Sequence, residues 1–386
     1  MVRIYIYLIL AASVSALATD MIIPALPVLQ RDLGTDYATI QLTISGFLVI
    51  YALSQLMSGF AGERLGKVRI LTASFIIFLA GSLVCFMAES LQMLMFGRIL
   101  QAVGAGAGPV LSRAIAKDSL PPKTLKRALS DISSASAVVP LIAPLMGGII
   151  LGHFRWNAIF LVMAVFSVIT IFFTPGSLSE RSDNNNSQEH SQGTFITPEF
   201  IHGTILVSLM LSSLFCYISL SPVIFMQTFS LSTIHYSLLF SASVLLFIVG
   251  NQFSKIEKAN NPFILFILNA LSLLPFLTES HSLPLCIAGA MLFNFTLGAY
   301  YPVANYIALQ IKGTRSGVAA SVTGFTQTVS AGSISFFAAS MTENGIGFSS
   351  MLGLSSFTLA GLSVVVVTIL KVTQWKTGKR VKSTVH

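Results

Sequence analysis

Residues 4–26 read IYIYLILAASVSALATDMIIPAL, and Asp20 is the only charged residue in this run. An α-helix needs about 20 mainly apolar residues to cross the ~30 Å hydrocarbon core of a bilayer. The run therefore predicts a membrane-spanning helix. A charge deep in a bilayer costs at least about 2.5–3.5 kcal/mol, so Asp20 needs a polar cavity or a partner of opposite charge.

The composition of the whole chain agrees with this interpretation. Of the 386 residues, 54% are hydrophobic and only 9% are charged, whereas a soluble domain has about 25% charged residues. The apolar runs are too long for the alternating strands of a membrane β-barrel. We therefore predict an all-α polytopic membrane protein. The net charge of +8 does not indicate a nucleic-acid partner, because most basic residues flank apolar runs.

Turn residues and charge clusters divide the chain into twelve apolar runs. The predicted spans are 4–26, 40–61, 68–88, 91–113, 131–152, 156–175, 199–222, 235–253, 262–279, 283–311, 317–340 and 347–371. A polar stretch rich in Ser, Asn and Gln separates the sixth from the seventh and predicts a flexible linker. The predicted domains are a six-helix bundle over 1–175, a cytoplasmic linker over 176–198, and a six-helix bundle with a short basic tail over 199–386.

The distribution of Lys and Arg predicts the orientation in the membrane. With a cytoplasmic N-terminus, 19 of the 22 basic residues lie on the cytoplasmic side, and only Arg31 and Arg155 lie outside. Cytoplasmic loops carry such an excess of basic residues. We therefore expect both termini in the cytoplasm.

The remaining basic residue, Arg98, lies inside the fourth run. Arg98 and Asp20 both lie about six or seven residues from the outer end of their runs, which is a depth of ~10 Å at 1.5 Å per residue. Equal depth allows the two side chains to pair, and the pair could take up and release a proton as it is broken and remade. A static ion pair that only fixes helix packing is the alternative.

Three cysteines, Cys85, Cys216 and Cys286, fall inside apolar runs without metal-ligand spacing. We expect them to be small core residues. No phosphate-binding glycine loop and no cluster of catalytic or metal-binding residues is found in the sequence, so neither ATP hydrolysis nor enzyme activity is expected.

The turn between the second and third runs, GFAGERLGKVRIL over 59–71, carries a specific motif. It resembles the signature loop of the major facilitator superfamily, G-x-x-x-D-R-x-G-R-K, with Glu63 in place of the aspartate. The matching residues are Gly59, Arg64 and Gly66. The resemblance implies that these residues and Glu63 form a conformational latch between the two bundles.

Two further helices carry the resemblance. In the fourth run, Arg98 and Gln101 match the family pattern R-x-x-Q-G. In the fifth run, Pro144, Gly147 and Gly148 match the antiporter motif G-x-x-x-G-P-x-x-G-G. Together with DMIIPALP at 20–27, these stretches resemble the Bcr/CflA subfamily of drug:proton antiporters. Related exporters carry a second acid two turns before the aspartate, where this chain has Ala12.

The resemblance implies a major facilitator fold of twelve helices in the inner membrane of a bacterium. It also implies proton-driven export of small organic molecules, with Asp20 and Arg98 in proton coupling. We expect no cofactor, no nucleic acid and a monomer, with the substrate, protons and the lipid bilayer as partners. Two alternatives remain open: an exporter dedicated to an endogenous metabolite such as a siderophore, and a transport-inactive sensor or assembly protein.

Polar groups inside a bilayer usually face a cavity or another helix. On this basis eight residues are candidates for the substrate cavity: Gln101, Tyr217, Gln227, Asn251, Asn294, Tyr300, Tyr301 and Asn305.

Overall fold

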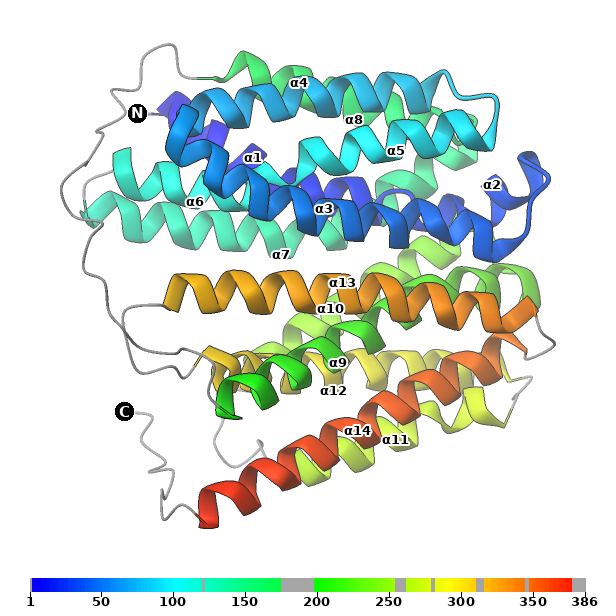
Figure 1. Cartoon of the computed structure of the whole chain (residues 1–386). Helices are drawn as coiled ribbons and strands as arrows, with labels where there is room; N and C mark the ends of the chain where they lie inside the picture. Colours follow the sequence, from blue (N-terminus) through cyan, green and yellow to red (C-terminus); the bar gives the residue numbers. More distant parts are fainter. Residues whose placement is uncertain are drawn as a thin grey trace. The chain divides into compact units, whose positions relative to one another are not determined.

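A computed structural model describes residues 2–119, 122–174, 198–253, 262–278, 282–309, 316–343 and 347–376 (Figure 1). All regular secondary structure within these ranges is helical, which confirms the predicted all-α class. The elements are α1 Val2–Asp20, η1 Ile23–Ala25, α2 Leu26–Asp32, α3 Tyr37–Leu65, α4 Lys67–Phe86, α5 Leu91–Ala105, α6 Ala107–Ser119, α7 Pro122–His153, α8 Ala158–Phe172, α9 Pro198–Pro222, η2 Val223–Thr228, α10 Thr233–Phe253, α11 Pro262–Leu277, α12 Leu283–Leu309, α13 Ser316–Glu343 and α14 Phe348–Lys376.

Each of the twelve predicted runs coincides with one helix or with a broken pair of helices. Eight helical stretches within the described ranges are long and apolar enough to cross a membrane. They are Arg3–Asp32, Tyr37–Leu65, Lys67–Phe86, Leu91–Ala116, Phe200–Thr228, Thr233–Phe253, Leu283–Tyr301 and Phe348–Val366. The polytopic helical architecture is thus confirmed. Residues 175–197 lie outside the described ranges, so the predicted linker and domain boundaries stay predictions.

The first span is broken, which the predicted continuous helix over 4–26 did not anticipate. The helix α1 ends at Asp20, and the short 3₁₀ turn η1 and the helix α2 follow. Pro24 explains the break, because proline has no N–H to donate to the carbonyl of Asp20, four residues earlier, and its ring would clash with that carbonyl. The break therefore places Asp20 at a helix end inside the span.

The seventh span ends in a related way. The helix α9 stops at Pro222, and the π-helix η2 continues the chain. In η2 the N–H of Phe229 donates to the carbonyl of Ile224 at 3.2 Å, five residues earlier. Single-turn π segments of this kind are often found at functional sites.

The described helices form two compact units. The first unit contains residues Met1–Glu189, Ile218–Leu245 and Gly332–Phe348, and the second contains His190–Tyr217, Leu246–Ala331 and Ser349–His386. In the first unit α4 packs along α5 and α8, and α1 packs against α6 and α7 (Figure 1). This packing brings the ends of α1 and α5 into one core.

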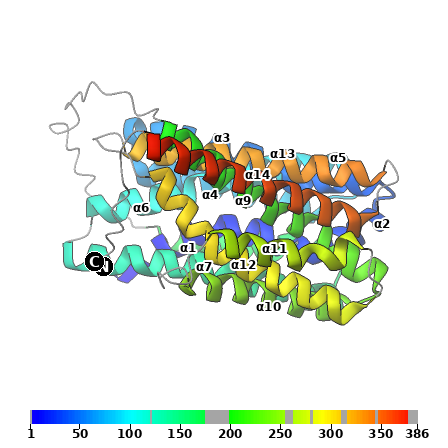
Figure 2. The same ribbon diagram turned by 90° about the horizontal axis from the view of Figure 1, so that it is seen from below.

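In the second unit α11 packs along α12, as the view in Figure 2 also shows. Its core is held by neutral contacts. The ring of Tyr217 lies 5.7 Å from that of Phe293, and the Nδ2 of Asn269 donates to the hydroxyl of Thr296 at 2.9 Å. A side chain at Gly298 would collide with the carbonyl oxygen of Phe247, so α10 and α12 approach closely at this glycine.

All three cysteines are buried, as predicted. Their exposed fractions are 0% for Cys85, 0% for Cys216 and 1% for Cys286. None of the three forms a disulfide.

Candidate functional site

Arg98 lies on α5 and is the largest fully buried side chain among the described residues, with 1% of its surface exposed. Its Nε donates to the carbonyl of Thr43 on α3 at 3.0 Å. Its Nη1 donates to the carbonyl of Ala18 on α1 at 3.0 Å and to the Oε1 of Gln101 at 2.9 Å. One guanidinium group therefore ties together three helices of the first unit.

Arg98 has one further favourable contact and one donor without a partner. The guanidinium lies over the ring of Phe47, with its central carbon 4.3 Å from the ring centroid. Such a cation–π contact contributes about 2 kcal/mol when it is desolvated. The buried Nη2 has no hydrogen-bond partner within the described residues. The guanidinium thus keeps an unused donor in the core.

Asp20 is the last residue of α1 and is 8% exposed. The hydroxyl of Thr19 donates to its Oδ1 at 3.0 Å. The same hydroxyl also lies 3.1 Å from the carbonyl oxygen of Ser15 and 3.2 Å from that of Ala16. Because a hydroxyl has one proton, the carboxylate shares this donor with two backbone acceptors.

The predicted ion pair between Asp20 and Arg98 is absent from this conformation. Neither Asp20 nor Arg98 is in a salt bridge within the described ranges, where Lys67 pairs with Asp118. The reason lies in the break after α1. Arg98 reaches the last turn of α1, but it binds the main-chain carbonyl of Ala18, two residues before the acid. The structure brings the two charges to one helix end without joining them.

Gln101 belongs to the Arg98 network and does not line an open cavity in this conformation. It is 0% exposed. Its Oε1 accepts from Arg98, and its Nε2 donates to the hydroxyl of Ser82 at 2.8 Å and lies 3.5 Å from the sulfur of Met163. Its amide therefore orients the guanidinium.

The antiporter-motif residues Pro144, Gly147 and Gly148 lie on α7, and all three are buried. A side chain at Gly147 would collide with the carbonyl oxygen of Met21 and would lie 3.2 Å from the Cγ of Pro24. The carbonyl of Met21 does not accept the usual helical hydrogen bond from Ala25, because the N–H of Ala25 donates to the carbonyl of Ile22 instead. Gly147 therefore lets α7 pack directly on the break beside Asp20.

The signature loop forms the turn between α3 and α4. Gly66 ends α3 with φ +98°, a conformation that residues with a side chain rarely adopt. Glu63 and Arg64 are exposed. Neither is in a salt bridge within the described part of the chain; the ion pair at this turn joins Lys67 to Asp118 at the end of α6. A side chain at Gly59 would lie 3.9 Å from the Cγ1 of Val110, an ordinary van der Waals contact.

Asp118 was not predicted as a site residue, because its sequence context, KDS, is typical of a solvated loop.

Gln41 on α3 was also not predicted as a site residue. Its side chain is 0% exposed, and both of its amide atoms lack a hydrogen-bond partner in the described residues. An unpaired buried amide costs about 1–3 kcal/mol, so it marks a place where water or a ligand would bind. A glutamine inside an otherwise apolar run was the available signal.

The polar residues proposed for the second half have different surroundings. Tyr217 is 1% exposed and Asn294 is 2% exposed, and the Nδ2 of Asn294 donates to the carbonyl of Ala290 in its own helix. Asn251 is exposed near the end of α10. Two of these three side chains are therefore buried and one is exposed.

Tyr300 is half-buried, and the hydroxyl of Tyr301 donates to the Oε1 of Gln327 at 3.2 Å. The side chain of Asn305 lies outside the described part of the structure. Of the eight predicted cavity residues, Gln227 is the one that lines a described pocket. Within the described ranges no group of three or more His, Cys, Asp or Glu side chains is placed to hold a metal ion.

Comparison with known proteins places these features in a family context. The family profile described as Major Facilitator Superfamily matches residues 8–339. The multidrug resistance protein MdtL of Klebsiella pneumoniae (strain 342) is 26% identical over 374 residues, which cover 92% of this chain and 91% of that protein. MdtL of Vibrio parahaemolyticus is 28% identical over 215 residues. That match, like the one with MdtL of Shigella dysenteriae, spans about half the length of the relative, 54%.

Solved structures show the same fold. A D-xylose–proton symporter superposes with a TM-score of 0.73 at 14% sequence identity, covering 94% of this chain and 96% of that chain. A bacterial homologue of the lysosomal transporter Spinster, in an inward-facing and occupied conformation, gives a TM-score of 0.71 at 17% identity, covering 95% of this chain and 94% of that chain.

Proposed function

This chain belongs to the major facilitator superfamily, and we propose that it exports small organic molecules, drugs among them, in exchange for protons. It is a polytopic membrane transporter and not an enzyme. The relatives named multidrug resistance proteins support drug export. The motif residues support a place among the Bcr/CflA antiporters, and with it the inner membrane of a bacterium.

The observation that carries the proton-coupling proposal is that two buried charges lie near one helix end, each incompletely paired. Asp20 shares a single hydroxyl donor, and Arg98 has an unused Nη2. A buried ionised carboxylate without a partner is costly, and protonation removes that cost. Asp20 can therefore be neutral in this conformation and ionised in one where Arg98 faces it.

The proposed cycle uses the contacts already described. In this conformation Arg98 holds the Ala18 carbonyl, and the Asp20 carboxyl takes up a proton. Movement of the break against α5 brings Nη2 to the carboxylate, and the proton leaves. Export then follows from the family's alternating access, with the proton gradient as the only energy source and no cofactor.

Growth in a transporter-deficient bacterial host tests the proposal. The host expresses the wild-type chain or Asp20→Asn, and both are grown across a panel of toxic compounds. We expect wild type to protect against some compounds and Asp20→Asn to protect against none at equal expression. Protection by Asp20→Asn would contradict proton coupling through this residue.

Transport assays with the same chain separate the two alternatives. A wild-type chain that protects against no toxic compound but exports an endogenous metabolite, such as a siderophore, would be a dedicated exporter. A chain that moves no compound in reconstituted vesicles under a pH gradient would be a sensor or an assembly protein.

A further inference from the structure

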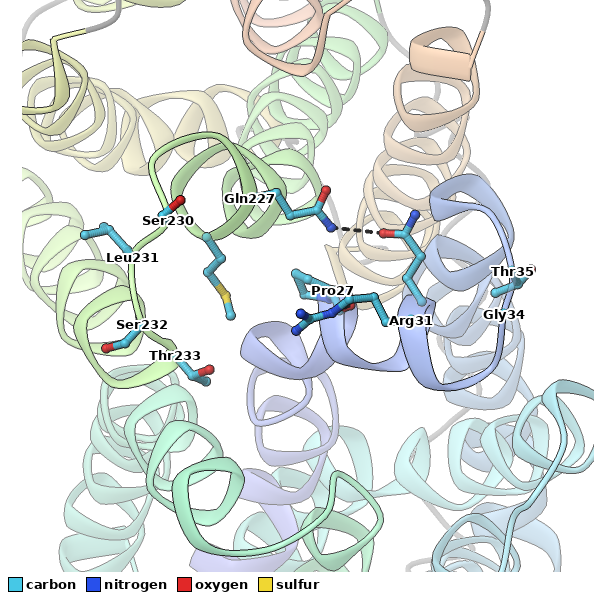
Figure 3. Close-up of a pocket in the computed structure, with 11 residues that line it drawn as sticks. Pro27, Arg31, Gly34, Thr35, Gln227, Ser230, Leu231, Ser232 and Thr233 are labelled. Carbon is cyan, nitrogen blue, oxygen red and sulfur yellow. Dashed lines mark hydrogen bonds between the residues drawn. The ribbon is translucent and has the colours of Figure 1, made fainter.

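A polar cavity lies between α2 and η2, beside the breaks of the first and seventh spans. Its volume is about 780 Å³, and it is open on one side. One wall is α2 with the turn that follows it, and the other is η2 with the turn that leads into α10 (Figure 3). Cavities of about 300–1,000 Å³ accommodate drug-sized ligands. The predicted topology places both walls on the external face.

Among the described residues that line this cavity, Arg31 is the only charged one. Its Nε donates to the carbonyl of Pro27 at 3.2 Å, and this hydrogen bond holds the Nε end of the guanidinium group in place. Figure 3 shows the guanidinium extending from α2 into the space between the two walls. Arg31 is in no salt bridge within the described residues. A guanidinium of this kind binds a carboxylate through two parallel N–H···O bonds.

The two acids nearest to Arg31 in the sequence do not line the cavity. Asp36 accepts from both the backbone N–H and the hydroxyl of Thr39, at 2.6 and 2.8 Å, as the N-cap of α3. Asp32 is exposed and is not one of the lining residues. Arg31 is therefore the charged group within the described lining, and both acids lie outside it.

Neutral hydrogen-bonding groups surround the guanidinium. The Nε2 of Gln227 donates to the Oε1 of Gln30 at 3.1 Å, across the two walls. This bond uses one atom of each amide, so the Nε2 of Gln30 and the Oε1 of Gln227 are available to a ligand. The hydroxyls of Ser230 and Thr233 and the thioether of Met226 complete the lining with polar and apolar contacts.

The backbone of the second wall is strained at this cavity. Ser230 has φ +55° and is the only residue other than glycine with positive φ within the described ranges. It follows the π-helix that carries Gln227. Sparsely populated backbone conformations cost on the order of 1–3 kcal/mol and gather at ligand sites. Two unusual backbone features therefore lie beside the one cationic group.

We propose that this cavity is a binding site for a small organic carboxylate, with its anionic group on Arg31 and its polar functions on Gln30 and Gln227. The site goes beyond proton-coupled export, because none of its residues belongs to the network around Asp20 and Arg98. It offers an exported or external compound a place to bind outside the coupling machinery.

Binding of a matched pair of fluorescent probes tests the proposal. N-dansylglycine carries the carboxylate, and N-dansylglycinamide is its uncharged analogue. The full chain is purified into lipid nanodiscs, and binding is followed by dansyl fluorescence. We expect wild type to bind dansylglycine at least about tenfold more tightly than the amide, which corresponds to about 1.4 kcal/mol. Arg31→Gln should remove this preference.

Arg155→Gln is the matched control, because Arg155 is also exposed and predicted external but does not line the cavity. It should bind both probes like wild type. Asp20→Asn should also keep the preference, so the result does not depend on whether export is proton-coupled. Equal binding of the two probes by wild type, or an unchanged preference in Arg31→Gln, would overturn the proposal.

Discussion

The first and the seventh spans are both interrupted at a proline, and they differ in what lies beside the break. At Pro24 the chain places a buried acid at the helix end, and Gly147 and Arg98 approach carbonyls of the same segment. At Pro222 the chain continues as a π-helix, and no charged residue lies between Ile218 and Thr228.

The polar groups at the second break are satisfied by neutral partners. The hydroxyl of Tyr37 donates to the carbonyl of Ser219, and the hydroxyls of Ser221 and Tyr236 lie 3.0 Å apart. A broken helix therefore does not itself require a charge, because neutral donors can satisfy the freed carbonyls. The charges at the first break must be explained by something other than the break, and proton coupling is the explanation we propose.

Asp20→Asn should have the largest effect. It keeps the shape of the side chain and removes its titration, so export driven by a pH gradient should fall to background in reconstituted vesicles while the protein still folds. Ser221→Ala at the other break removes only a neutral hydrogen bond, which contributes about 0.5–1.5 kcal/mol, and should retain export. Equal loss in both variants would remove the distinction between the two breaks.

Arg98→Ala should cause the second-largest loss of export. It removes the cation and leaves the carbonyls of Ala18 and Thr43 without their donor, so we expect transport to fall by at least about tenfold, or about 1.4 kcal/mol of barrier. The Asp20→Asn/Arg98→Ala double variant should transport no worse than either single variant, because both disable one switch. Additive losses in vesicle assays would show that the two residues act separately.

A methyl group added at Gly147 should lower thermal stability and export more than a methyl group added at Gly148. At Gly147 it meets main chain, the carbonyl oxygen of Met21, whereas at Gly148 it meets the side chain of Ser237. Overpacking typically costs about 1–3 kcal/mol, so Gly147→Ala should lower both thermal stability and export. Gly148→Ala should do so less, because rotation of Ser237 relieves the contact with its Oγ, so that only its Cβ, 2.8 Å away, must shift. The reverse order in thermal unfolding in detergent would mean that α7 does not pack tightly on the first break.

Asp118→Asn should have the smallest effect. It removes the ion pair with Lys67, but the two side chains are 36% and 28% exposed, and exposed pairs contribute about 0–1 kcal/mol. We expect unchanged thermal stability and a modest reduction in transport rate. Glu63→Gln tests the predicted latch beside it. A larger loss in Glu63→Gln would favour Glu63 as the latch acid, in a conformation other than this one.

The sequence predicted the helical spans well, because each requires a long apolar run and little else. It also drew attention to Asp20 and Arg98, since charges inside such runs stand out, and their role in proton coupling stays a prediction. It did not predict that Arg98 binds the Ala18 carbonyl, because a pairing inferred from depth along two straight helices ignores the break at Pro24. The second-half cavity residues were the weakest predictions, because polarity alone does not distinguish a side chain that faces a cavity from one like Asn294, which bonds to its own helix.

The burial of Cys85, Cys216 and Cys286 has a practical consequence for mapping the membrane topology. Thiols react as exposed thiolates, so buried cysteines are inert towards water-soluble maleimides. A single cysteine can therefore be introduced into the native chain without first replacing these three. A membrane-impermeant maleimide applied to intact cells should modify a cysteine at position 279, which is predicted external, and should reach one at position 184 only after the membrane is opened.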